Sequence, residues 1–263
     1  MTYQFIDYTI NDGVGILMLK RPDKLNSFTV PMLEEIIAVL DEAADNPDVR
    51  ALLLSGTGRA FGAGQDLSER EVNPGDPPPD LGESLEKRYN PIVLKIRSLE
   101  MPVVCAVNGV AAGAAANIAL ACDLVLAARS ARFIEPFCRL GLVPDAGGTW
   151  SLPRLVGRAR AMGMTLLGGD VSAEQAEQWG LIWKCYDDEH LMIEALNLAK
   201  TMAKQPTAGL ALIKRAINES HTNTLADQLD LERDFQRITA NSEDYREGVT
   251  AFLEKRQPSF KGR

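Results

Sequence analysis

The sequence has little of what several common kinds of catalytic site require. Its 263 residues include two histidines, His190 and His221, so neither a Ser-His-Asp triad nor a histidine-based metal site is easy to build. Both stand in polar surroundings and are interpreted as solvated surface residues. No G-x-G-x-x-G follows a strand with an acidic residue downstream, and no G-x-x-x-x-G-K-[ST] occurs, which excludes dinucleotide and P-loop sites.

Cysteines are also few, and the 28 basic residues are outnumbered by 36 acidic ones. The four cysteines lack metal-ligand spacing, which is typical of reduced thiols in the cytoplasm. The net charge of −8 argues against a nucleic-acid surface, although a local basic pocket for a phosphate-bearing small ligand stays open. No window reaches the ~18 apolar residues of a membrane span, and the start shows no leader pattern. We expect a soluble cytoplasmic protein with no membrane partner, built as one large domain, one domain with an appendage, or two domains sharing a core.

The stretch 103–123 organises the rest of the chain. An apolar, β-like run at 103–107 meets Asn108-Gly109 and then a segment of small residues that leads into an apolar, helix-like run. Gly109, Gly113 and the intervening alanines leave the backbone almost bare where the helix begins. The pattern predicts a strand, a tight turn and a buried helix whose first N–H groups suit a developing negative charge. A tightly packed helix that needs small residues for packing alone is the alternative.

The remaining elements follow from hydrophobic periodicity and capping residues. Strands are expected at 14–20, 50–55, 123–127 and 131–134, with a second glycine-rich turn at 61–67. An amphipathic helix follows Thr29, and a helical segment at 85–99 has a possible kink at Pro91. Beyond residue 155 helices dominate, with Ser172, Thr224 and Ser242 as N-caps.

A proline-rich segment spans residues 73–82. Its four prolines and two glycines exclude a regular helix or strand, so we expect an exposed loop. The loop is either an inert surface excursion or a flap over the acyl end of a pocket.

Two carboxylates are candidates for acid-base chemistry. Asp145 stands between Pro144 and paired glycines in an otherwise apolar stretch, where partial burial would raise its pKa toward that of a useful general base. The alternative for Asp145 is a helix N-cap. Glu135 lies in a strand-like FIEPF segment and is interpreted as solvated.

Three motifs together are more specific than any of these features. FGAGQDL at 61–67, NGVAAGAAANIALACD at 108–123 and GLVPDAGGTWSLPRLVG at 141–157 resemble, in this order and spacing, the crotonase (enoyl-CoA hydratase/isomerase) superfamily. The resemblance covers essentially the whole chain. It implies an α/β fold in which residues 1–195 form a spiral of ββα repeats with the acyl-CoA site. Residues 196–263 would form a helical region that builds a homotrimer or hexamer, although individual repeats are not visible in the sequence.

The resemblance also implies roles for particular residues. The substrate would carry coenzyme A, with no further cofactor and no metal. The backbone N–H groups of Gln65 and Ala114 would form an oxyanion hole for the thioester oxygen. The residues that match the segments in contact with CoA are Lys24 and Leu25, then Ala63, Asp66 and Leu67, and, more weakly, Phe252 and Lys255, from a neighbouring subunit.

A departure from the hydratase pattern narrows the expected reaction. Hydratases of the superfamily use two glutamates around the double bond, whereas the matching positions here hold Asn117 and Asp145. An amide cannot exchange the proton that hydration requires, so we expect an isomerase with Asp145 as the acid/base and Asn117 as at most a polar contact. The resemblance implies conversion of ring-1,2-epoxyphenylacetyl-CoA to oxepin-CoA and a shift of 3-enoyl-CoA double bonds. A hydratase-like enzyme on another acyl-CoA and a non-catalytic binding or assembly protein are the alternatives.

Overall fold

A six-stranded sheet forms the centre of the chain. The computed structural model describes residues 3–70 and 80–262. In spatial order the strands are β1 (Ile6–Asn11), β2 (Val14–Leu19), β3 (Ala51–Gly56), β5 (Val103–Val107), β7 (Leu124–Ala128) and β10 (Lys184–Tyr186). β1 and β2 form an antiparallel hairpin, and the other neighbours are parallel. Every residue of β3 and β5 is buried, as expected for parallel strands covered on both faces.

Four short strands form a second sheet. They are β4 (Ala60–Gly62), β6 (Val110–Ala112), β8 (Arg132–Ile134) and β9 (Asp170–Ser172), of which only β8 and β9 pair antiparallel. β4, β6 and β8 directly follow β3, β5 and β7 in the chain, so three successive turns each place one strand in each sheet. This repetition is the spiral that the sequence motifs implied. β6 corrects the expectation that the turn at 108–109 leads straight into a helix.

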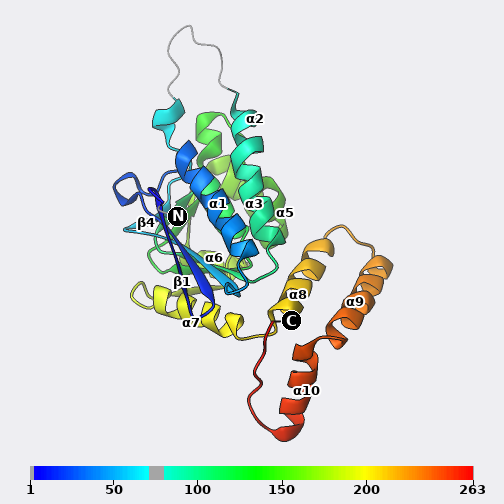
Figure 1. Cartoon of the computed structure of the whole chain (residues 1–263). Coiled ribbons are helices and arrows are strands. Elements are labelled where there is room, and N and C mark those ends of the chain that lie inside the picture. Colours follow the sequence, from blue (N-terminus) through cyan, green and yellow to red (C-terminus); the bar gives the residue numbers. More distant parts are fainter. Residues whose placement is uncertain (1–2, 71–79, 263) are drawn as a thin grey trace.

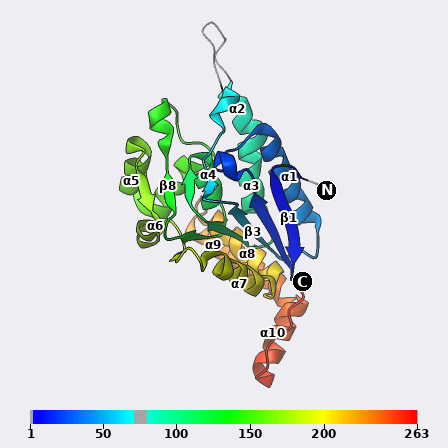
Figure 2. The same cartoon turned by 90° about the vertical axis from the view of Figure 1, so that its left-hand side faces the viewer.

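Helices cover both faces of the larger sheet. Figures 1 and 2 show α1 (Val30–Asp45) and α3 (Asn90–Ser98) on one side of the sheet and α7 (Leu191–Ala203) on the other. α3 is preceded by α2 (Leu81–Ser84) and by a π-helical turn at Leu85–Tyr89. The expected irregularity near Pro91 is therefore a π turn in an otherwise continuous helical segment.

Three further helices lie between the strands of the second half. α4 (Ala114–Leu120) is buried along its whole length. α5 (Gly148–Leu167) is interrupted at Gly157. α6 (Ala173–Trp179) is capped by Ser172, whose side chain accepts from the Gln175 N–H at 3.2 Å. Short 3₁₀ turns connect the elements at Pro22–Lys24, Leu67–Arg70 and Pro136–Leu140.

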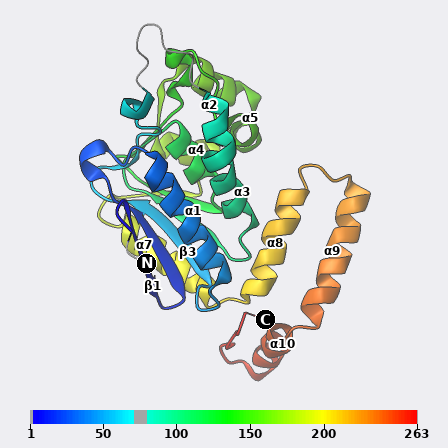
Figure 3. The ribbon, with the colours of Figure 1, turned by 45° about the horizontal axis from the view of Figure 1, so that its top comes forward.

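The last three helices form an arm that projects from the core (Figures 1 and 3). They are α8 (Thr207–Glu219), α9 (Leu225–Ala240) and α10 (Glu243–Glu254). Thr224 and Ser242 cap α9 and α10 as predicted. α7 runs across residue 195 and packs against the sheet, with Ala195 and Ala199 fully buried, so the arm itself begins at α8. The division into 1–195 and 196–263 as separate units stays a prediction.

Most of the proline-rich segment 73–82 lies outside the described residues, so its proposed role as a flap stays a prediction. The part that is described begins with Asp80, whose side chain caps α2 by accepting from the Glu83 N–H at 3.1 Å. Within the described ranges, no helix is long and apolar enough to cross a bilayer.

Candidate active site

The two glycine-rich turns meet at the start of α4. Gly64 has a φ of +81°, and a Cβ built on it would lie 2.9 Å from the Ala112 carbonyl oxygen and 3.7 Å from the Ala114 nitrogen. Only glycine tolerates both this conformation and this close approach. The turn that carries Gln65 therefore lies directly against the first residue of α4, where helix N–H groups lack intrahelical acceptors. The structure brings together the two backbone segments that the sequence assigned to an oxyanion hole.

The side chain of Gln65 is held by its neighbours. Its Nε2 donates to the Phe28 carbonyl oxygen at 3.1 Å, and its Oε1 accepts from the Tyr89 hydroxyl at 2.8 Å. Tyr89 is 1% exposed and packs edge-on against Phe28 with ring centroids 6.2 Å apart. The π turn at Leu85–Tyr89 delivers this tyrosine to the turn. Sequence reasoning noted the irregular Tyr89-Asn90-Pro91 segment but did not assign Tyr89 a role.

The residues assigned to CoA contacts near the N-terminus cluster beside the same turn. The Ala63 N–H donates to the Leu25 carbonyl oxygen at 3.0 Å, which joins the 24–28 segment to the 63–67 segment. Lys24 and Leu67 are exposed at the surface of this cluster. A cationic and an apolar side chain therefore flank the turn.

Asp66 fixes this cluster to the core. Its Oδ2 accepts from Arg21 Nη2 at 2.9 Å, and its Oδ1 accepts from the Ser68 hydroxyl at 2.7 Å. The bond from Ser68, and after it the bond from Arg21, lowers the pKa of Asp66 to about 2. Asp66 is therefore ionised across the physiological range and serves as an anchor for Arg21.

Asp145 lies half-buried in the turn before α5. The N-cap of α5 is Gly147, with a φ of 83°, so the alternative interpretation of Asp145 as that cap is wrong. The Asp145 carbonyl oxygen accepts from the Gly148 N–H at 2.9 Å and from Asn117 Nδ2 at 3.0 Å. The backbone of Asp145 is thus fixed to the buried helix α4.

Asn117 connects the two acidic residues of the site. It is 0% exposed, and its Nδ2 also donates to Glu135 Oε2 at 3.3 Å. A Cβ on Gly148 would lie 2.5 Å from Asn117 Nδ2, so the amide packs directly against the first residue of α5. Asn117 binds protein groups on two segments at once, which the sequence did not predict.

Glu135 is the functional candidate that sequence reasoning misjudged. We expected a solvated side chain, but Glu135 is 1% exposed. Burial, reinforced by the charge of Asp145 and opposed by the Asn117 hydrogen bond, raises the pKa of Glu135 to about 8. The local FIEPF pattern carries no signal for this burial, because α4 and the turn before α5 supply the covering groups.

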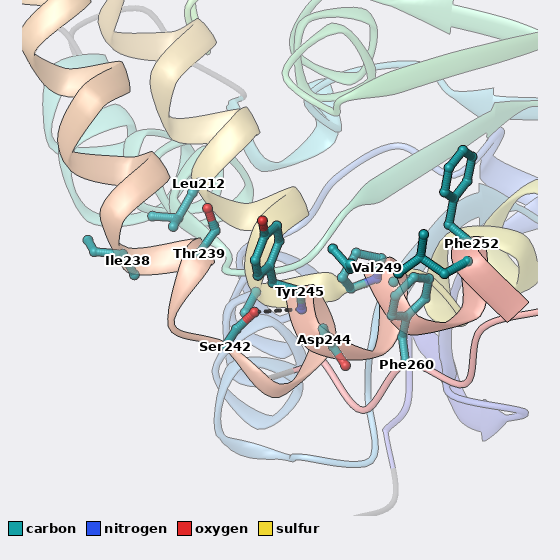
Figure 4. A pocket seen from close by; sticks show the side chains of 14 residues that line it. Leu212, Ile238, Thr239, Ser242, Asp244, Tyr245, Val249, Phe252 and Phe260 are labelled. Atoms are coloured by element: carbon teal, nitrogen blue, oxygen red, sulfur yellow. Dashed lines mark hydrogen bonds between the residues drawn. The ribbon is translucent and has the colours of Figure 1, made fainter.

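Phe252 and Lys255 lie on the projecting arm. Phe252 is 82% exposed, and Lys255 ends α10 in the left-handed conformation. Figure 4 shows Phe252 beside Val249 and Phe260, at one end of a cavity of about 580 Å³ between the arm helices. The structure does not bring these residues to Asp145 within one chain. The cavity lining is largely apolar and includes Leu212, Ile238 and Tyr245.

No group of three or more His, Cys, Asp or Glu side chains within residues 3–70 and 80–262 is arranged to hold a metal ion. The candidate site comprises backbone N–H groups and the half-buried carboxyl of Asp145, and Asn117 connects it to the buried carboxyl of Glu135. Such a set can polarise a carbonyl oxygen and move a proton beside it.

Comparison with known proteins agrees with this geometry. The enoyl-CoA hydratase/isomerase family model matches residues 9–263. The chain is 55% identical over 260 residues to the 1,2-epoxyphenylacetyl-CoA isomerase of Escherichia coli K12, covering 99% of each chain. It is 36% identical to the 2,3-dehydroadipyl-CoA hydratase of the same organism, covering 95% of this chain and 96% of the relative. An enoyl-CoA hydratase structure from Geobacillus kaustophilus HTA426 superposes with a TM-score of 0.91 at 37% identity, covering 99% of each chain. The chain belongs to the enoyl-CoA hydratase/isomerase family, the crotonase superfamily.

Proposed function

We propose that this chain is an acyl-CoA isomerase that converts ring-1,2-epoxyphenylacetyl-CoA to oxepin-CoA and also moves 3-enoyl-CoA double bonds to the 2-position. The observation that carries the proposal is the 55% identity, along 99% of both chains, to an Escherichia coli enzyme named for the first of these substrates. The half-buried Asp145 beside the buried α4 supports it, because both reactions need one proton carrier next to a polarised thioester.

The proposed oxyanion hole uses the backbone N–H groups of Gln65 and Ala114. Both lie where the Gly64 turn meets the start of α4, and the helix dipole adds a favourable field for an enolate oxygen. One such donor typically contributes ~2.7 to 4 kcal/mol of transition-state stabilisation. The hydrogen bonds that hold the Gln65 side chain prevent it from swinging into the space for the thioester.

Asp145 is proposed as the acid/base. Its carboxylate removes a proton from one carbon of the acyl group, the enolate forms against the two N–H groups, and the same carboxyl returns the proton to another carbon. With the epoxide substrate, the carbon–carbon bond shared by the epoxide and the six-membered ring also breaks, which expands the ring to the oxepin with no atom gained or lost. Asn117 cannot exchange a proton at neutral pH, so it orients the turn that carries Asp145.

A hydratase-like reaction is the second candidate, and Glu135 is the observation in its favour. Hydration needs one group to deprotonate water and another to handle the α-carbon proton, and Glu135 supplies a second carboxyl near Asp145. With a pKa of about 8, however, Glu135 is protonated at pH 7 and is a poor base for water. Isomerisation therefore remains the better-supported function.

The test compares two reactions and two variants. Purified wild-type protein is assayed for isomerisation of ring-1,2-epoxyphenylacetyl-CoA and of a 3-enoyl-CoA, and for hydration of crotonyl-CoA. Asp145→Asn should lower the isomerase rate by ~10² to 10⁴ and leave CoA binding near normal. The matched control is Asp48→Asn, which makes the same change at an exposed residue distant in sequence from Asp145. It should have the activity of wild type. Efficient hydration, or a wild-type rate in Asp145→Asn, would contradict the proposal.

The proposal extends to CoA binding and assembly. Lys24 and Leu25, with Ala63, Asp66 and Leu67, would contact the adenine and phosphates, and no further cofactor is proposed. Phe252 and Lys255 would approach the CoA of a neighbouring subunit in a homotrimer or hexamer. The exposure of Phe252 and of Leu253, 73% exposed, on the arm supports this assembly, because isolated chains rarely present such apolar faces to water. A monomeric mass in light scattering at micromolar concentration would refute it.

We also propose that the protein acts in the cytoplasm. Its four cysteines are unpaired, and two of them, Cys105 and Cys122, are buried. Free thiols are the rule in a reducing compartment. Fractionation of the native host's cells, with recovery of the protein in the cytosolic fraction, would test this.

A further inference from the structure

Glu135 is a buried acid that the proposed proton transfer does not use. It follows β8 and precedes the 3₁₀ turn Pro136–Leu140. Its Oε2 accepts the 3.3 Å bond from Asn117, and its Oε1 has no hydrogen-bond partner among residues 3–70 and 80–262. Burial of an unpartnered oxygen costs more on a charged carboxylate than on a neutral carboxyl, because the charge loses its solvation. The surroundings of Glu135 therefore favour its neutral form.

One amide joins Glu135 to the proposed acid/base. Asn117 Nδ2 donates both to Glu135 Oε2 and, at 3.0 Å, to the carbonyl oxygen of Asp145. The amide cannot move away toward α5, because Gly148 leaves no space for even a methyl group beside it. A change in the charge of Glu135 is therefore transmitted to the Asp145 turn through a rigid contact.

Among the residues that the structure describes, no charged side chain beside Glu135 neutralises it. Arg132, three residues before it, lies 3.6 Å from Asp170 of β9, and both side chains face solvent. Arg139, in the 3₁₀ turn that follows, is exposed. From α4 the facing group is the neutral Asn117, and from the turn before α5 it is Asp145, which acts on Glu135 electrostatically. The charge of Asp145 is therefore the one that acts most directly on Glu135.

We propose that Glu135 is a positioning residue for Asp145. Glu135 works in its neutral form, and its ionisation sets the alkaline limit of the isomerase. The inference rests on the proposed function. In the neutral form, Asp145 carries the only negative charge of the pair and takes up the substrate proton as the enolate forms. In the ionised form, Glu135 adds a second negative charge beside that of Asp145 as the enolate forms. The charge of ionised Glu135 opposes the Asp145 carboxylate and the developing enolate, so the rate should fall by about tenfold or more.

The test is a pH-rate profile from pH 5.5 to 10 for wild type, Glu135→Gln and the exposed control Glu189→Gln. Wild type and the control should lose activity as the pH rises past about 8. Glu135→Gln keeps a neutral group of the same shape, so it should stay within about threefold of wild type at pH 7 and lose the alkaline decline. An unchanged alkaline decline in Glu135→Gln would overturn the proposal. A loss at pH 7 as large as that of Asp145→Asn would also overturn it, because Glu135 would then be a direct proton carrier.

A second measurement does not depend on the substrate. A carboxyl with a raised pKa in the folded state binds more protons than it does unfolded between pH 4.5 and 8, so its contribution to stability is lost as the pH rises through that window. The urea midpoint of wild type should therefore fall more steeply across this range than that of Glu135→Gln. If the urea midpoints of wild type and Glu135→Gln fell equally steeply with pH, the claim that Glu135 is neutral in the folded protein would be refuted, even if every isomerase assay failed. Different slopes with no isomerase activity would refute the proposed function alone.

Discussion

A single methyl group at Gly148 should disrupt the candidate site. The loss of folding stability can be worked out from the contacts of Gly148. The Cβ of Gly148→Ala would lie 2.5 Å from Nδ2 and 2.7 Å from Oδ1 of Asn117. Real contacts of this kind are longer, so either Asn117 or the start of α5 must shift. Overpacking of this sort typically costs 1–3 kcal/mol. Gly148 is the first residue of α5, so alanine gains there only part of the roughly 0.5–1 kcal/mol it gains over glycine in a helix interior, which does not cancel the loss.

The same helix provides the matched control. Gly163 also lies in α5, and a Cβ there meets no atom within 4 Å. Gly163→Ala should therefore stabilise the protein by roughly 0.5–1 kcal/mol, whereas Gly148→Ala should destabilise it by about 1–2 kcal/mol. Urea unfolding monitored by circular dichroism measures both changes. The double variant Asn117→Ala/Gly148→Ala removes the clashing amide and should lose less stability than the two single changes added together.

Catalysis gives an independent readout of the same contact. Displacing Asn117 breaks the 3.0 Å bond to the Asp145 carbonyl oxygen and releases the turn that carries the proposed acid/base. We expect the kcat of Gly148→Ala to fall by ~10²-fold, since a displacement of about 1 Å can cost that much. If Gly148→Ala were as stable and as active as Gly163→Ala, the reasoning about the Asn117 contact would be refuted.

Two further predictions concern the turn at Gln65. Tyr89→Phe removes the 2.8 Å bond to Gln65 Oε1 and should destabilise the fold by about 1 kcal/mol while lowering kcat severalfold, as steady-state kinetics and urea unfolding can show. Asp66→Asn removes a carboxylate whose pKa is lowered to about 2 in the folded state. The stability from Asp66 is present above its unfolded pKa near 4 and is lost as the pH falls toward 2, so the acid-unfolding curves of wild type and variant should converge there. Tyr89→Phe with unchanged kcat, or parallel acid-unfolding curves, would contradict these assignments.

The sequence predicts four strands of the central sheet, β2, β3, β5 and β7, because each contains a largely apolar run, but it does not predict β1 or β10. The segments at 51–56 and 103–107 are buried on both faces and follow clear turn residues. The short strands β6, β9 and β10 have three residues each, which is too few for a period of two to be recognised. Their pairing depends on partners far away in the chain. Long-range pairing rather than local pattern therefore decides the second sheet and the β10 edge of the first.

The candidate site was predictable where glycines allow close backbone approach. Gly64 and Gly109 mark such approaches, and the turn at Gly64 lies against the start of α4. Side-chain environments were harder to predict. Glu135 was misjudged because its burial depends on Asn117 and on the turn at Asp145, and neither is adjacent to it in the sequence. The roles of Gln65, Ala114 and Asp145 in catalysis stay predictions.

The amide at position 117 makes physical sense only together with its two acceptors. Asn117 Nδ2 faces the Asp145 carbonyl oxygen and Glu135 Oε2, and an amide nitrogen can donate to both. An ionised glutamate at this position would have no proton to give, so three oxygen acceptors would face one another in a buried space, which is strongly unfavourable. The departure from the hydratase pattern at Asn117 is therefore coupled to the buried Glu135. With that acid neutral, Asp145 is the single charged carboxylate of the group, which is the arrangement that proton transfer from carbon to carbon requires.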